Sequence, residues 1–207
     1  MKLSKILFME IAVPFEDIKQ SEMALKVIKH GTQILLILYR PSMLTKYVQT
    51  WEQEDLDGLI VGMINLVPSE ESNKIYEVKA IAAESGYGPV MYDIAMSYIK
   101  PNYLMADRSH VSDAARKVWA YTFNNRLSEY DTIKIGKDSK WMDSEDKEVP
   151  FLNLAYKIKK ELSITSSVIT RDKQFFANEP RKNTREEMLT TLEEQAWVYF
   201  RDRMQEQ

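Results

Sequence analysis

Residues 74–99, KIYEVKAIAAESGYGPVMYDIAMSYI, decide the fold of this chain. The first ten favour a β-strand, and the last ten carry apolar side chains at helical spacing. Between them stands a short turn with two glycines, which lets a ligand approach the backbone closely. The N–H groups at the start of a helix have no partners within it and bind phosphate. The stretch therefore predicts a phosphate-binding turn whose donors are the amides of Gly86, Tyr87 and Gly88, with a plain tight turn as the alternative.

A second β-prone run precedes this strand, and the two runs predict an antiparallel hairpin. Residues 58–67, GLIVGMINLV, are followed by the turn-rich connector PSEESN. In the strand after the connector, alternate side chains are expected on opposite faces of the sheet. One set is Ile75, Glu77, Lys79 and Ile81, and the other is Tyr76, Val78, Ala80 and Ala82.

The residues before the hairpin predict further strands and helices. The run QILLILYR at 33–40 is too apolar to alternate and indicates a buried strand or a buried helix. The expected order is a strand at 6–13, a helix at 15–30 ended by Gly31, this buried segment, and a short polar helix at 44–53.

The residues after residue 100 predict a similar mixture. Ser112 can cap a helix at 113–126, whose inner face is expected to hold Ala114, Val118 and Tyr121. The expected order is a short strand at 103–106, this helix, a strand at 132–135, an acidic loop at 137–148, a helical segment at 152–162 and an irregular stretch at 163–181.

The chain ends in a predicted helix. Thr184 and Glu187 form a capping-box pattern at its start. Trp197 and Phe200 lie to one side of its apolar stripe, which consists of Leu189, Leu192, Ala196 and Tyr199.

Together these elements predict an α/β (α+β) fold with a central mixed, mostly antiparallel sheet flanked by helices. The chain has 207 residues, the size of one domain or of one domain with an appendage. We place the core at residues 1–136 and a helical C-terminal extension at 137–207.

The composition excludes several classes of protein. The chain has no cysteine, which excludes disulfides, thiolate zinc sites and a cysteine nucleophile, and it has only two histidines, His30 and His110. The formal net charge of −3 argues against a nucleic-acid partner held by its phosphates. No apolar run approaches the roughly 20 residues that span a bilayer, and Glu10 interrupts the one segment that resembles a signal peptide. We therefore expect a soluble cytoplasmic protein without a metal or a membrane anchor.

Residues 83–88, AESGYG, resemble the Q/R-x-x-G-x-G/A motif of the GNAT superfamily of N-acetyltransferases. In that family the motif forms the turn between the fourth strand and the following helix, where the pyrophosphate of coenzyme A binds. Gly86 and Gly88 match the two glycines, and Ala83 stands where the family has Gln or Arg. The segments YLMADRS and SDAARKVWAYTFNNR resemble the fifth strand and fourth helix of that core. The series GYGPVMYDIAM, LMADRSHVSDAA and VWAYTFNNR is similar to GNAT-like proteins encoded by bacteriophages. The resemblance covers roughly residues 58–135.

This resemblance implies a reaction and a site. Family members transfer an acetyl group from acetyl-CoA to an amine, so the implied partners are acetyl-CoA and an unknown amine acceptor, with no metal. The implied cofactor-binding residues are Ile81, Ala82 and Ala83 on the strand and Gly86, Tyr87 and Gly88 in the turn. The implied catalytic residues are Glu77 as general base, with Glu84 as second choice, and Tyr121 as the acid that protonates the leaving thiolate. A solvated strand residue and a core residue are the alternatives for Glu77 and Tyr121.

Two other functions stay open at this point. A GNAT-like fold without catalysis, serving as a phage interaction protein or virion-associated structural protein, is favoured by Ala83 and by Pro89, which has no N–H to donate. Self-association through the C-terminal helix, or binding of a protein partner there, is favoured by Trp197 and Phe200. A phage protein would reside in the host cytoplasm or in the virion.

Overall fold

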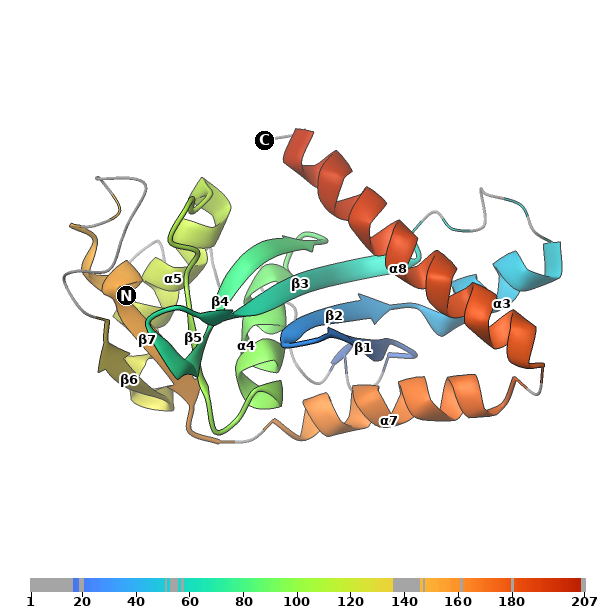
Figure 1. Cartoon of the computed structure of the whole chain (residues 1–207), viewed down its shortest axis with the longest axis horizontal. Coiled ribbons are helices and arrows are strands. Elements are labelled where there is room, and N and C mark those ends of the chain that lie inside the picture. The colour runs from blue at the N-terminus through green and yellow to red at the C-terminus, as the bar shows by residue number, and fades with distance from the viewer. Residues whose placement is uncertain are drawn as a thin grey trace.

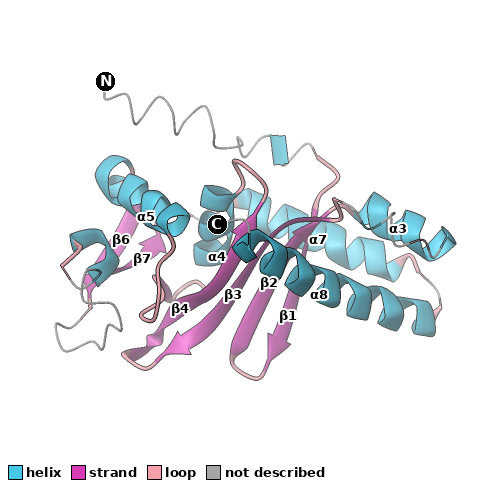
Figure 2. Cartoon of the chain, turned by 90° about the horizontal axis from the view of Figure 1, so that it is seen from above, coloured by secondary structure: helices cyan, strands magenta, loops and turns pink. Residues whose placement is uncertain are grey.

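The computed structural model describes residues 17–18, 21–50, 52, 56, 58–135, 146, 148–160, 162–179 and 181–205. These residues form one seven-stranded sheet with helices on both faces (Figures 1 and 2). The predicted α/β class, with its mixed and mostly antiparallel sheet and its C-terminal helix, is confirmed. The predicted strand at 6–13 and most of the predicted acidic loop lie outside the described residues.

The sheet contains one parallel step among its described strands, between β4 and β5; the other neighbours are antiparallel. In space the strands follow the order β1-β2-β3-β4-β5-β7-β6. Along the chain the elements are β1 Ala24–His30, β2 Gln33–Tyr39, α3 Pro41–Thr50, β3 Ile60–Ser69, β4 Ser72–Ala83, α4 Gly88–Tyr98, β5 Tyr103–Met105, α5 Asp113–Asn125, β6 Tyr130–Lys134, β7 Leu154–Ile158, α7 Ser163–Ala177 and α8 Lys182–Gln205. Short 3-10 helices cover Leu127–Glu129 and Pro150–Asn153.

The central elements were predicted at nearly these positions. The β3–β4 hairpin, α4 after it and the short strand β5 are confirmed, and the apolar run at 33–40 is the strand β2. Ser112 caps α5, since its Oγ accepts the N–H of Ala115 at 3.3 Å. The inner face of α5 is shifted by one position: Trp119 and Thr122 are buried, whereas Ala114 is exposed.

Strand β1 corrects the prediction of a helix at 15–30. Residues Ala24–His30 pair with β2 along their whole length, from Ala24 opposite Tyr39 to His30 opposite Gln33. The turn between the strands holds Gly31 at φ +62°, a conformation that glycine adopts without strain. The apolar residues had helical spacing, but pairing with the buried strand β2 outweighs local propensity.

Two predictions after residue 150 are also wrong. The segment at 152–162 was expected to be helical, but Leu154–Ile158 form β7, which lies between β5 and β6. The stretch at 163–181 was expected to be irregular, but Ser163–Ala177 form α7. Because β7 belongs to the same sheet as β4 and β5, the boundary drawn at residue 136 falls within a single sheet.

Apolar clusters cover both faces of the sheet. Side chains of α4 and α7, such as Ile94 and Val168, pack on one face. Side chains of α3 and α8, such as Leu44 and Leu192, pack on the other. In Figure 1, α7 accordingly runs below the sheet and α8 crosses above it. Gly62 of β3 brings α4 close, because a Cβ at this position would lie 3.0 Å from Cγ of Met91.

A buried carboxylate ties α4 to α5 and β6. Asp93 is 2% exposed, and it accepts hydrogen bonds from the Tyr130 hydroxyl at 2.5 Å and from Nη1 of Arg126 at 2.9 Å. Burial raises the pKa of Asp93, and the charge of Arg126 and the hydrogen bond from Tyr130 only partly oppose this rise. The folded protein therefore binds a proton at Asp93 more tightly than the unfolded chain does.

We expect Arg126→Met to lower the free energy of unfolding by about 3–5 kcal/mol near neutral pH, because it leaves Asp93 buried without its counter-charge. The variant should lose stability as the pH rises from the unfolded Asp pKa of about 4 toward the raised folded pKa. Urea unfolding should therefore show a smaller loss at about pH 5 than at about pH 8. Glu129→Gln is the control: it removes a half-exposed partner of the same arginine and should cost at most about 1 kcal/mol. An equal loss at both pH values in Arg126→Met would contradict the account of Asp93.

Candidate functional site

Strands β4 and β5 separate after a short parallel ladder. Its three pairs are Ile75 with Tyr103, Tyr76 with Leu104 and Glu77 with Met105. β4 continues to Ala83, whereas β5 ends at Met105. Along residues 78–83, therefore, no described strand pairs with the edge of β4 that faces β5. An open strand edge of this kind offers backbone N–H and C=O groups to an extended ligand.

The direction of the backbone groups on this edge follows from one hydrogen bond. The N–H of Glu84 donates to the carbonyl of Val61 at 2.8 Å and so points toward β3. Backbone groups of successive residues in a strand point to opposite edges. Ala83 and Ile81 therefore direct theirs toward the gap, and Ala82 directs its own toward β3. Of the three strand residues predicted to bind the cofactor, Ile81 and Ala83 have the required direction.

A β-bulge in β4 changes which side chains face the gap. Asn65 lies opposite Ala80 and Leu66 lies opposite Val78, so Lys79 has no partner on β3. A bulge bends the strand and re-aims the side chains that follow it. Ile81 consequently packs with Val78 on the α4 side of the sheet. The strict alternation that we predicted for this strand is wrong beyond the bulge.

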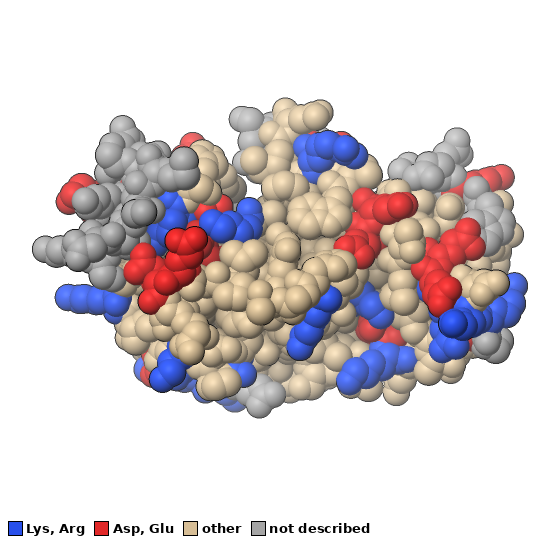
Figure 3. Space-filling view, viewed as in Figure 1, with Lys and Arg blue, Asp and Glu red and all other residues tan. Residues whose placement is uncertain are grey.

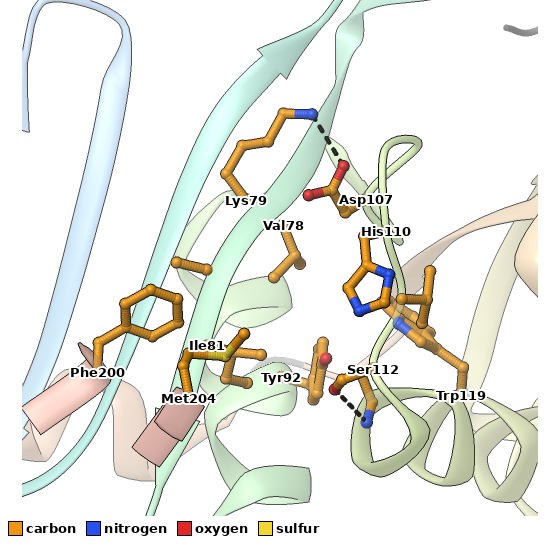
Figure 4. Close-up of a pocket in the computed structure, with 13 residues that line it drawn as sticks. Val78, Lys79, Ile81, Tyr92, Asp107, His110, Ser112, Trp119, Phe200 and Met204 are labelled. Atoms are coloured by element: carbon orange, nitrogen blue, oxygen red, sulfur yellow. Dashed lines mark hydrogen bonds and ion pairs between the residues drawn. The ribbon is translucent and has the colours of Figure 1, made fainter. Parts of the chain in front are cut away.

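The gap beyond the parallel ladder contains a cavity of about 170 Å³, which we call the wedge cavity. It lies between β4, α4, the start of α5 and the end of α8 (Figure 4). Its apolar walls include Val78, Ile81, Val111, Ala115, Trp119, Phe200 and Met204, and its polar lining consists of Lys79, Tyr92, Asp107, His110 and Ser112. An apolar groove with a few polar groups is typical of small-molecule sites.

Charged side chains hold the point where β4 and β5 part. Oε1 of Glu77, which is 6% exposed, accepts the backbone N–H of Arg108 at 2.6 Å and Nζ of Lys79 at 2.7 Å. The same Nζ donates to Oδ1 of Asp107 at 3.0 Å. Partial burial lowers the pKa of Lys79, but its hydrogen bonds to both carboxylates outweigh this effect and raise it. For Asp107, burial raises the pKa. Hydrogen bonds from Ser109 and Lys79 outweigh this effect, so the pKa of Asp107 is lowered.

A second cavity, of about 550 Å³, borders the other side of this charged group, and we call it the acidic cavity. Its lining includes Glu70, Glu71, Glu77, Arg108 and Ser109, and Lys79 lines both cavities. Glu77 therefore lies where the two cavities approach each other.

The structure places only some of the other predicted residues at the wedge cavity. Tyr121 is not among the residues that line the wedge cavity, where α5 contributes Ala115 and Trp119. Asp107 pairs with Lys79 at 3.0 Å. His110 and Tyr92 do line the wedge cavity. Sequence reasoning overlooked Tyr92, because Tyr92 stands among the apolar residues of a buried helix.

The turn between β4 and α4, residues 84–88, is the glycine turn. Gly86 has φ +83°, which favours glycine, whereas Gly88 opens α4, and a Cβ added there would have no atom within 4 Å. The N–H of Tyr87 donates to the carbonyl of Glu84 at 3.0 Å, so it closes the turn. Gly88 lies in the first helical turn, where N–H groups have no partner within the helix.

The carboxylate of Glu84, next to this turn, has a counter-charge. Nη1 and Nη2 of Arg40 donate to its two oxygens at 2.8 and 2.9 Å. A bidentate pair of this kind is among the stronger charge-assisted contacts. The negative charge of Glu84 is thus offset beside the helix start, and a guanidinium stands within reach of the glycine turn.

Comparison with protein-family models, with curated proteins and with solved structures found no match for this chain. In the described part of the chain, none of the helices has the length and apolar character needed to cross a membrane.

We expect Gly86→Ala to lower the free energy of unfolding by about 1–2 kcal/mol, because its left-handed backbone is strained with a Cβ. Gly88→Ala should stay within about 0.5 kcal/mol of the parent, since its side chain would meet open space. Paired thermal melts of the two variants compare the positions directly. A larger loss in Gly88→Ala than in Gly86→Ala would contradict the geometry of the glycine turn.

Proposed function

We propose that this chain is an acyl-CoA-dependent N-acyltransferase with a GNAT fold, which transfers an acetyl group from acetyl-CoA to an amine. One observation carries the proposal: the open edge of β4 leads from the wedge cavity directly into the glycine turn at the start of α4. A single extended ligand can then place an amide-bearing arm along β4 and its phosphates at the helix start. Acetyl-CoA has both parts in this order.

The open edge suits the pantetheine arm, which carries two amides. Backbone groups of Ile81 and Ala83 would pair with these amides as a neighbouring strand would. The pyrophosphate would meet the N–H of Gly88 and the positive end of the helix dipole. Arg40 offers a cation beside the turn, where Ala83 lacks the Gln or Arg of the family motif.

The acidic cavity suits the acceptor. Glu70 and Glu71 favour a protonated amine on this side. In the proposed step Glu77 takes one proton from the bound ammonium, and the neutral amine nitrogen then attacks the thioester carbonyl carbon. The C–N bond forms and the C–S bond breaks, and the second proton lost by the nitrogen passes through solvent to the departing thiolate. Tyr121, which the resemblance implied as the acid, has no place in the wedge cavity and takes no part in this step.

A second candidate is a GNAT-like fold that has lost catalysis and serves as an interaction or virion-associated protein. It is favoured by Glu77, whose Oε1 already accepts two hydrogen bonds. Trp197 of α8 is 37% exposed and offers apolar surface to a protein partner or a second copy. If the source is a phage, either function belongs to the host cytoplasm or the virion.

A nucleic-acid acceptor is disfavoured by the charge distribution. On the face shown in Figure 3, side chains of both signs are interspersed, with no extended region of positive charge among the described residues. Phosphate binding needs clustered Lys and Arg. A small amine or a protein amine is the better-supported acceptor.

Calorimetric titration with acetyl-CoA and with free CoA tests the proposal. We expect micromolar binding by the parent protein and a loss of at least about tenfold in Gly88→Glu, because a carboxylate would lie where the pyrophosphate binds. The loss should shrink as the salt concentration rises. Gly88→Gln, which has the same length without the charge, is the matched control and should bind much more tightly than Gly88→Glu.

Two results would count against the enzyme. A folded parent protein that binds neither ligand would contradict the cofactor site altogether. Binding without release of free CoA, across a panel of small amines, would favour the inactive interaction protein. If CoA is released, Glu77→Gln should keep binding and lose roughly 100-fold or more in turnover, as expected for a general base.

A further inference from the structure

One buried hydroxyl in the wedge cavity has no hydrogen-bond partner among the described residues. The side chain of Tyr92, on α4, is 3% exposed and lines the cavity together with Ile81 and Ser112 (Figure 4). Within the part of the chain that the structure describes, nothing accepts from or donates to its hydroxyl. A buried polar group without a partner is costly, and its presence in a cavity wall points to a ligand.

Three other buried tyrosines have hydrogen-bond partners for their hydroxyls. Tyr39 donates to Asp172 at 3.0 Å, Tyr130 donates to Asp93 at 2.5 Å, and Tyr156 donates to the carbonyl of Phe151 at 2.8 Å. A phenylalanine at position 92 would pack in the same place without the cost of burying an unpaired hydroxyl. The hydroxyl of Tyr92 therefore has a role other than stabilising the free protein.

The ring of Tyr92 is held in a fixed position. It meets Trp119 edge-on, with ring centroids 4.9 Å apart, and Trp119 in turn packs against Tyr156 at 5.2 Å. Burial raises the pKa of Tyr92, so its hydroxyl keeps its proton and remains a donor. The Tyr92 hydroxyl is thus a hydrogen-bond donor in a fixed position at the wall of the cavity.

The place of Tyr92 along α4 indicates which part of a ligand it meets. It lies four residues after Gly88, which corresponds to about 6 Å along the helix axis. Phosphates at the glycine turn would therefore be followed, at this distance, by the arm of the ligand and not by its reacting end, which would lie near Glu77.

We propose that the Tyr92 hydroxyl is the specificity-determining donor of the wedge cavity and that it binds an amide carbonyl of the pantetheine arm of CoA. This inference rests on the proposed function, because it takes CoA as the ligand. No described residue occupies the hydrogen-bonding capacity of this hydroxyl, so it is available to the ligand. The buried hydroxyl lowers the stability of the free protein, and it contributes to recognition of the ligand.

Tyr92→Phe tests this inference with two readouts of opposite sign. The melting temperature of the free variant should rise by about 2–4 °C, because a buried unpaired hydroxyl is removed. Its affinity for CoA, for acetyl-CoA and for pantetheine should fall by a common factor of about three to ten, because the ligand carbonyl loses its donor. Its affinity for adenosine 3′,5′-bisphosphate, which lacks the arm, should be unchanged.

Tyr156→Phe is the matched control. It removes a hydroxyl that has a partner and lies outside the wedge cavity, so it should lower the melting temperature and leave CoA affinity unchanged. Undiminished CoA binding by Tyr92→Phe would overturn the inference alone, as would a loss confined to acetyl-CoA, which would place the hydroxyl at the thioester. If the folded parent protein binds neither CoA nor the bisphosphate, the proposed function fails and this inference fails with it.

Discussion

The short parallel ladder between β4 and β5 is the constraint on which the rest of the site depends. Only three residue pairs join the strands, and Glu77, at the last of them, accepts the backbone N–H of Arg108 as the chain leaves β5. Lys79 adds a link from the bulge to Asp107. These contacts fix where the strands part, and hence the wedge cavity and the direction of the open β4 edge. The predicted general base is thus also part of what holds the cavity open.

The sequence predicted the fold best where elements are decided locally. Hairpin β3–β4, the glycine turn and α4 follow from alternation, turn residues and helical spacing within a few residues of one another. Prediction failed for β1 and β7, whose strand conformation depends on partners distant in sequence. In α7 a signal was present: Ile164, Val168, Asp172 and Phe176 recur at intervals of four and are buried. The serines and threonines around them concealed it.

The site was predicted less completely, for physical reasons. Gly86 and Gly88 could be found because glycine has a distinct backbone role. The choice of Ile81 and Ala83 over Ala82 depends on strand pairing, and the bulge at Lys79 depends on the register with β3. Tyr92 carries no pattern of its own, because only the folded structure shows that its hydroxyl has no partner among the described residues. The contribution of α8 to the cavity, through Phe200 and Met204, is likewise a matter of tertiary packing.

Backbone amide exchange, followed residue by residue by NMR with and without CoA, tests the central claim most directly. If CoA binds along the open edge of β4, the amides of Ile81 and Ala83, which point into the gap, exchange more slowly once CoA is bound. The amide of Ala82 already pairs with β3 and should change little. Slowing at Ala82 alone, or unchanged exchange along the whole of β4 at saturating CoA, would contradict the claim that the open edge of β4 binds the cofactor.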